Sequence, residues 1–272
     1  MSKILRINMG AEGGPTSNEE PLGDYAGLGG RAMTSTIIAK EVPPTCHPLS
    51  SDNKMVIAPG LLSGTAAVMS GRISVGFKSP LTGGIKEANS GGQAAQVIAR
   101  LGYAAIILEG APTGKDLYKV IINQQGVSIE KDNSLCMLGN YDLIDKIKGN
   151  FNEKTTFMSI GPAGEMKMYA STVACTDREQ RPTRHAARGG SGAVMGSKGI
   201  KVIVFDDEGA KRLAPMDLDA FKAANKIFSE GLKKHAVTGE GLPAYGTNVL
   251  TNVINEAGGY PTRNFQKGRF EG

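Results

Sequence analysis

Two glycine-rich segments of this chain have the composition of phosphate-binding turns. The first is Ala88-Asn-Ser-Gly-Gly-Gln-Ala-Ala95, and the second is Ala187-Arg-Gly-Gly-Ser-Gly-Ala193. Each is followed by a short apolar stretch, a glycine and an aliphatic run, which predicts a turn, a short helix and a buried strand. Such a turn presents backbone N–H groups at the start of a helix, an arrangement that binds phosphate well.

The two turns recur at a nearly constant spacing. Gly91 and Gly189 are 98 positions apart (189 minus 91), and the later glycines, Gly102 and Gly199, are 97 apart (199 minus 102). One gap therefore aligns the copies. A pair of equivalent turns predicts a two-fold-like site, either for one ligand with two phosphates or for two copies of one ligand.

Apolar runs and their periodicity predict the elements that position these turns. Strands are expected at residues 1–9, 54–58, 72–78, 103–108, 118–122, 127–130, 156–160, 169–174 and 201–205, and helices at residues 34–42, 92–101, 141–148, 191–198, 220–234 and 246–257. The polar segments 10–24 and 176–183 are expected to be links without regular structure.

The chain changes character near residue 210. Residues 54–110 and 154–209 each run through a strand ending in a Pro/Gly turn, a second strand, a polar loop, the glycine pair, a helix and a strand. Residues 210–272 contain mainly amphipathic helical patterns. We therefore expect an α+β chain with a ligand-binding domain over 1–209 and the start of a helical domain over 210–272.

The composition excludes several classes of protein. Aromatic residues make up 6% and there is no Trp, which argues against a stacking platform for nucleic acid. The net charge of +5 is mild, and no apolar run has the length of a signal-peptide core or a membrane span. The three cysteines, Cys46, Cys136 and Cys175, form no C-x-x-C pair, which predicts reduced thiols in a cytoplasmic protein and too few ligands for a four-cysteine cluster.

Several motifs of this chain together resemble a known family. They are Ser79-Pro-Leu-Thr-Gly83 with Ala88-Asn-Ser-Gly-Gly92, Ser159-Ile-Gly-Pro-Ala-Gly-Glu165, the stretch Arg184–Lys198, Gly241-Leu-Pro-Ala-Tyr-Gly-Thr247 and Tyr260-Pro-Thr-Arg-Asn-Phe-Gln266. In this order they resemble the N-terminal part of the tungsten-containing aldehyde:ferredoxin oxidoreductases, the bis-molybdopterin enzymes. The resemblance implies two β-sheets related by a pseudo-two-fold axis with flanking helices, followed by the start of a mostly helical domain.

The resemblance also implies a cofactor and a reaction. In the family, two molybdopterin groups hold one tungsten, or in this chain equally molybdenum, through four dithiolene sulfurs, and Mg²⁺ bridges their phosphates. Aldehydes are oxidised to carboxylic acids, and electrons pass through a 4Fe–4S cluster to ferredoxin. Family members are longer, so the cluster and catalytic residues are expected only with a C-terminal part. We therefore expect this chain alone to be inactive. We also expect it to form a homodimer or to associate with that C-terminal part or with other subunits.

Individual residues match the family's cofactor site. Arg72 and Arg188 match pterin-contacting arginines, and Arg184 matches the arginine between the pterin and the cluster. Asn89 matches a Mg²⁺ ligand through its amide oxygen, and His185 matches a Mg²⁺ ligand through its backbone carbonyl. The expected cofactor-binding set is Arg72, Asn89, Ser90, Gly91, Gly92, Arg184, His185, Ala186, Ala187, Arg188, Gly189 and Gly190.

Two of these positions depart from the family pattern, and each candidate has a structural alternative. His185 replaces a small residue and Ala187 replaces a glycine, which puts a close backbone contact at Ala187 in doubt. In a purely structural role, Arg72 would be a surface arginine, Asn89 would cap a helix, and the His185 imidazole would only support the fold. Two other functions stay open: a subunit of an aromatic acyl-thioester reductase complex, and a non-catalytic module that binds a phosphorylated ligand.

Overall fold

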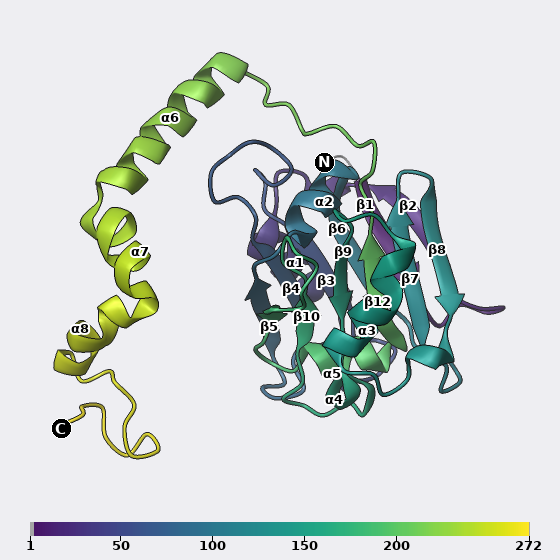
Figure 1. The fold of residues 1–272 in the computed structure, drawn as a ribbon. Helices are drawn as coiled ribbons and strands as arrows, with labels where there is room; N and C mark the ends of the chain where they lie inside the picture. The colour runs from purple at the N-terminus through teal and green to yellow at the C-terminus, as the bar shows by residue number, and fades with distance from the viewer. Residues whose placement is uncertain (1–2, 272) are drawn as a thin grey trace. The chain divides into compact units, whose positions relative to one another are not determined.

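The computed structural model describes residues 3–271, which divide into two compact units. The first unit ends at Ala214 and the second begins at Pro215 (Figure 1). The first contains all twelve named strands and the candidate site, whereas the second is helical.

The first unit is built from two six-stranded sheets. One sheet has the order β2-β1-β6-β3-β4-β5, with β1 (Lys3–Asn8), β2 (Thr16–Pro21), β3 (Met55–Pro59), β4 (Ile73–Lys78), β5 (Ile85–Ser90) and β6 (Tyr103–Glu109). The other has the order β8-β7-β12-β9-β10-β11, with β7 (Tyr118–Asn123), β8 (Gly126–Lys131), β9 (Thr156–Ser159), β10 (Val173–Cys175), β11 (Arg184–Ala186) and β12 (Ile200–Phe205).

The two sheets share one topology, strand for strand. In each, the first strand pairs in parallel with the sixth, and the other neighbours are antiparallel. Even an irregularity recurs: the ladder skips one residue between Tyr103 and Ala105 of β6, and between Ile200 and Val202 of β12. The equivalence therefore covers β1–β6 and β7–β12, and the predicted pair of related sheets is confirmed.

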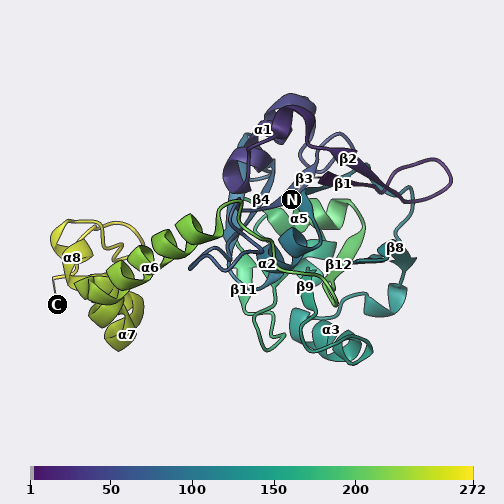
Figure 2. The same cartoon turned by 90° about the horizontal axis from the view of Figure 1, so that it is seen from above.

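Helices occupy both the outer faces and the space between the sheets. The helices are η1 (Gly23–Tyr25), α1 (Gly30–Glu41), α2 (Ala94–Arg100), η2 (Asn133–Leu135), α3 (Asn140–Ile147), η3 (Lys148–Asn150), α4 (Pro162–Glu165) and α5 (Ser191–Ser197). Figure 2 shows α1 and α3 at opposite sides of the unit, with α2 and α5 between them. Apolar residues of both sheets pack with α2 and α5 in one central core, while α1 and α3 each bury an apolar stripe against one outer face.

Three edge strands escape prediction from the sequence, and one predicted strand is mostly a loop. Residues 10–24, expected to be a link, contain β2, and neither β5 nor β11 was expected. These strands are polar or very short, and backbone pairing with an inner neighbour holds them in place, so they carry no clear apolar alternation. The strand expected at 169–174 is wrong for residues 169–172, because β10 begins at Val173.

The second unit consists of α6 (Leu218–Lys234), a π-helical turn η4 (Ala236–Gly241), α7 (Leu242–Tyr245), a 3-10 turn η5 (Gly246–Leu250) and α8 (Thr251–Glu256). Asp217 caps α6, because its carboxylate accepts from the Ala220 N–H at 2.9 Å. The α-helix expected at 246–257 is wrong for residues 246–250, which form the 3-10 turn η5 that begins at Gly246 (φ +58°). Among the residues that the structure describes, every helix is too short or too polar to cross a lipid bilayer.

Candidate cofactor-binding site

The predicted site residues gather where the two sheets meet. β5 and β11 are the outermost strands of their sheets, and they lie against each other. Arg72 directly precedes β4. Asn89 and Ser90 are the last two residues of β5, and Arg184 is the first residue of β11. The fold therefore brings the two distant parts of the predicted set to one edge of the unit.

Two arginines, one from each half, flank Gly91. The Arg72 Nε donates to the Asn89 Oδ1, and Arg72 Nη1 lies 3.5 Å from the position a Gly91 Cβ would occupy. The Arg184 Cγ and Cδ lie 3.9 Å from the same point. Both side chains therefore lie at ordinary van der Waals distance from the Gly91 Cβ position, and they come from opposite halves of the unit.

These arginines keep their charge available for a ligand. Arg72, Arg184 and Arg188 are exposed, and among the described residues none of the three forms an ion pair. An unpaired guanidinium binds phosphate through two parallel N–H groups. The edge formed by β5 and β11 is therefore suited to a ligand with phosphate groups.

A carboxylate next to this edge supplies a hydrogen-bond acceptor. Arg72, Asn89 and Glu87 line one shallow depression beside α1. The Glu87 Oε1 is buried without a hydrogen-bond partner among the described residues, while its Oε2 lies 3.5 Å from the Arg31 Nε. An orphaned acceptor beside unpaired cations fits a ligand that combines phosphate oxygens with ring N–H groups, as a pterin does.

His185 is held by a side chain just before the neighbouring strand β10. Its Nδ1 lies 2.9 Å from the Thr172 Oγ1. Burial lowers the pKa of His185, and the nearby Pro182 carbonyl opposes that effect. His185, Ala187 and Arg188 are exposed, whereas Ala186 is buried.

The glycine turns pack against the opposite half of the unit. A Cβ on Gly92 would lie 2.5 Å from the Thr176 carbonyl oxygen, just after β10. A Cβ on Gly190 would lie 2.6 Å from the Pro80 Cγ, just after β4. Each turn thus contacts the segment that follows the fourth strand of the other half, and the two contacts are reciprocal.

The structure corrects the alignment of the turns. α2 begins at Ala94 and α5 at Ser191, an offset of 97 (191 minus 94) that holds through both helices. Gly92, rather than Gly91, is therefore the counterpart of Gly189, and both have a left-handed backbone (φ +96° and +84°). The second half has one extra residue between its edge strand and its helix.

Substitution of Gly92 by alanine is expected to destabilise the fold by about 2–4 kcal/mol, because left-handed strain adds to a clash with the Thr176 carbonyl. Chemical denaturation measures this loss. Gly83→Ala is the matched control, since Gly83 has φ +73° but nothing within 4 Å of its Cβ position. The control is expected to lose only about 1–2 kcal/mol, and equal losses in both variants would contradict the close packing of the turn.

A buried lysine joins the two halves behind the turns. Lys198, which the sequence suggests is a cation at a helix C-terminus, is the C-cap residue of α5 and is fully buried. Its Nζ donates to the carbonyl oxygens of Ser50 at 3.1 Å and Asn53 at 2.5 Å, both in the first half. Burial lowers the pKa of Lys198 to about 8.

This depressed pKa predicts a rise in stability with pH. Below about pH 8 the Lys198 amine is protonated in both the folded and the unfolded chain. Between about pH 8 and 10.5 the folded protein releases this proton first, so the unfolding free energy rises by up to about 3 kcal/mol. Denaturation of wild type and Lys198→Met across this range measures the effect. A constant difference between the two proteins would contradict the prediction.

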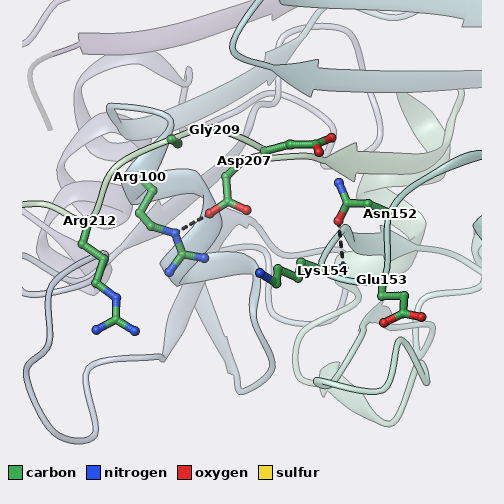
Figure 3. Close-up of a pocket in the computed structure, with 9 residues that line it drawn as sticks. Arg100, Asn152, Glu153, Lys154, Asp207, Gly209 and Arg212 are labelled. Atoms are coloured by element: carbon green, nitrogen blue, oxygen red, sulfur yellow. Dashed lines mark hydrogen bonds and ion pairs between the residues drawn. The ribbon is translucent and has the colours of Figure 1, made fainter.

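A second depression is lined mainly by charged residues, two of which form an ion pair. Arg100 and Asp207 form an ion pair there, and the Asn152 Nδ2 donates to the Asp206 Oδ1 at 2.8 Å. Figure 3 shows Arg100 facing Asp207 across this space. The Arg100–Asp207 pair joins the end of α2 to the segment after β12, so it is a polar contact between the halves.

Within the described part of the chain, the structure holds no group of three or more His, Cys, Asp or Glu side chains placed to bind a metal ion. Cys175 is buried, Cys46 is half-buried and Cys136 is exposed.

Comparison with protein families gives two matches in sequence order. Residues 4–207 match the N-terminal domain of aldehyde ferredoxin oxidoreductase, and residues 222–272 match domains 2 and 3 of the same family. Two tungsten-containing aldehyde ferredoxin oxidoreductases, from Pyrococcus abyssi and Pyrococcus horikoshii, are 41% and 40% identical over 272 residues. Each comparison covers 99% of this chain but 43% of the relative, so the chain spans less than half the length of these proteins.

A solved structure shares the fold. It is the active site complex BamBC of benzoyl coenzyme A reductase with 1,5-dienoyl-CoA, which has a TM-score of 0.76 and 28% identity, over 85% of this chain and 34% of that one. The paired sheets, the two family matches and the identity to these relatives agree along the chain. The chain belongs to the aldehyde ferredoxin oxidoreductase family.

Proposed function

We propose that this chain binds a bis-molybdopterin cofactor carrying tungsten or molybdenum along the β5–β11 edge, as part of an oxidoreductase for aldehydes. The observation that carries the proposal is the meeting of Arg72 and Arg184 from opposite halves around Gly91. Two related half-sites suit a cofactor with two pterin groups. The relatives from Pyrococcus, which are tungsten-containing aldehyde ferredoxin oxidoreductases, support the metal and the substrate class.

The side chains at the β5–β11 edge have the charge and the hydrogen-bonding groups to bind the phosphates of that cofactor. Arg72, Arg184 and Arg188 would bind the phosphates, and the Glu87 Oε1 would accept from a ring N–H. Mg²⁺ stays a prediction at Asn89 and the His185 carbonyl. The Asn89 amide oxygen already accepts from the Arg72 Nε, so a cation there would share that oxygen with a positive charge.

When bound, the cofactor would supply the redox centre for oxidising an aldehyde to a carboxylic acid. This chain's residues would hold and orient the cofactor, and no catalytic side chain is proposed among them. A 4Fe–4S cluster and transfer of electrons to ferredoxin are proposed for the assembly with a C-terminal part or with partner subunits, and this chain by itself is expected to lack aldehyde oxidation.

A second candidate function is reduction of an aromatic acyl thioester within a multi-subunit complex. The observation that favours it is the structural similarity to the benzoyl coenzyme A reductase complex. Cofactor content alone does not separate the two candidates, because the same edge is proposed to bind the cofactor in both. Aldehyde-dependent and acyl-thioester-dependent electron transfer, measured side by side on the assembled protein, separates them.

The proposal is tested on protein purified from a host supplied with both tungstate and molybdate. Metal analysis is expected to find one tungsten or molybdenum per chain. Denaturation in air is expected to release two fluorescent oxidised pterins per metal. Folded protein that carries neither metal nor pterin would overturn the proposed function.

A further inference from the structure

Asn89 and His185 occupy equivalent places in the two halves. Asn89 pairs with Ser74, the second residue of β4, and His185 pairs with Ala174, the second residue of β10. β4 and β10 are the fourth strands of sheets with the same order, and β5 and β11 are their edge partners. The register therefore places an amide in one half where the other half has an imidazole.

Each of these side chains is held by the residue just before the fourth strand. The Arg72 Nε donates to the Asn89 Oδ1, and the Thr172 Oγ1 lies 2.9 Å from the His185 Nδ1. Asn89 and His185 are both exposed. The two halves thus present a planar side chain in the same way, each fixed by one hydrogen bond from an equivalent neighbour.

Each half also has an arginine close to its planar side chain, but the two arginines occupy positions that are not equivalent. The first half has Arg72 where the second has Thr172, and the second half has Arg184 where the register places Ala88 in the first. Each half therefore supplies a planar side chain with N–H groups and at least one guanidinium, and the second half has Arg188 in addition to Arg184. A phosphate group is bound well by a guanidinium together with a further N–H donor.

We propose that the imidazole of His185 contacts the phosphate of the second pterin, in the place that the amide of Asn89 takes toward the first. This inference rests on the proposed function and deepens it. It concerns the His185 side chain, whereas the resemblance implies a role only for the backbone carbonyl. It also accounts for Thr172, whose hydroxyl orients the ring.

The test measures how fast pterin is lost from purified, cofactor-loaded protein, by fluorescence of the filtrate during repeated dilution. His185→Ala is expected to lose pterin about tenfold faster than wild type, because one hydrogen bond to a charged group is removed. His185→Asn copies the first half and is expected to restore near-wild-type retention. His47→Ala, a histidine change in a different loop, is the control and is expected to match wild type. Circular dichroism confirms that each variant is folded.

Several results would overturn the inference. Wild-type retention in His185→Ala would remove the contact while leaving the proposed function intact, because the wild type still carries pterin. Loss from His185→Asn as fast as from His185→Ala would contradict the equivalence with Asn89. Wild-type protein with neither metal nor pterin would remove the proposed function, and this inference with it.

Discussion

Replacing Arg72 and Arg184 together with alanine is expected to lower the pterin and metal content of the purified protein by roughly a hundredfold or more. Each guanidinium would form charged hydrogen bonds to phosphate, and one such bond contributes about 1.5–3 kcal/mol. The two arginines come from opposite halves, and both lie within 4 Å of the position that a Gly91 Cβ would occupy. Metal analysis and pterin fluorescence after denaturation measure the loss.

The control for this experiment removes two exposed arginines elsewhere. Arg178 and Arg212 are exposed and form no ion pair among the described residues, as is true of Arg72 and Arg184. Arg178→Ala/Arg212→Ala therefore changes the net charge equally and is expected to keep the cofactor. Arg188→Ala alone is expected to weaken retention about tenfold, as one phosphate contact. Normal cofactor content in the Arg72/Arg184 variant would remove the proposed phosphate clamp.

Replacing Lys201 with methionine is expected to lower the unfolding free energy by about 3–5 kcal/mol, because it leaves a buried carboxylate without its cation. Lys201 forms an ion pair with Glu165, and their side chains are 0% and 7% exposed. The Lys201 Nζ also donates to the Leu138 carbonyl at 2.8 Å. Glu165 in turn accepts from the Met137 N–H at 2.9 Å, so the pair fixes α4 to the loop before α3.

A double-mutant cycle separates this ion pair from the rest of the fold. Glu165→Gln keeps an acceptor for the Met137 N–H, and the Lys201→Met/Glu165→Gln protein contains neither charge. The double variant is expected to be more stable than Lys201→Met alone, because no unpaired buried charge remains. Losses in the two single variants that simply add in the double variant would contradict a coupled pair.

The inner strands could be predicted from the sequence, and the edge strands could not. β6 and β12 are continuous aliphatic runs whose burial follows from their composition. β5 and β11 carry the site and owe their structure to pairing with β4 and β10, which no local pattern reveals. The candidate residues were found through motifs, whereas their meeting depends on the order of strands in two sheets.

Two further features lie beyond sequence patterns for physical reasons. Lys201 occurs within an aliphatic run and its partner Glu165 follows a Pro/Gly turn, so neither residue type nor spacing predicts that they pair. The glycine turns have the composition of phosphate-binding turns, but the closest neighbour of Gly92 is Thr176 of the opposite half, and Gly190 lies between Tyr169 of its own half and Pro80 of the opposite half. Packing against these protein atoms therefore requires glycine at Gly92 and Gly190, independently of any ligand.

The position of the metal tests the central claim most directly. Crystals of metal-loaded protein, measured at the absorption edge of tungsten or molybdenum, locate the metal by its anomalous scattering. We predict one metal peak beside β5 and β11, with pterin density on both sides of the peak. Arg72 and Arg184 are expected to contact the pterin density. A bound metal at any other place, such as the depression beside Arg100 and Asp207, would contradict the account.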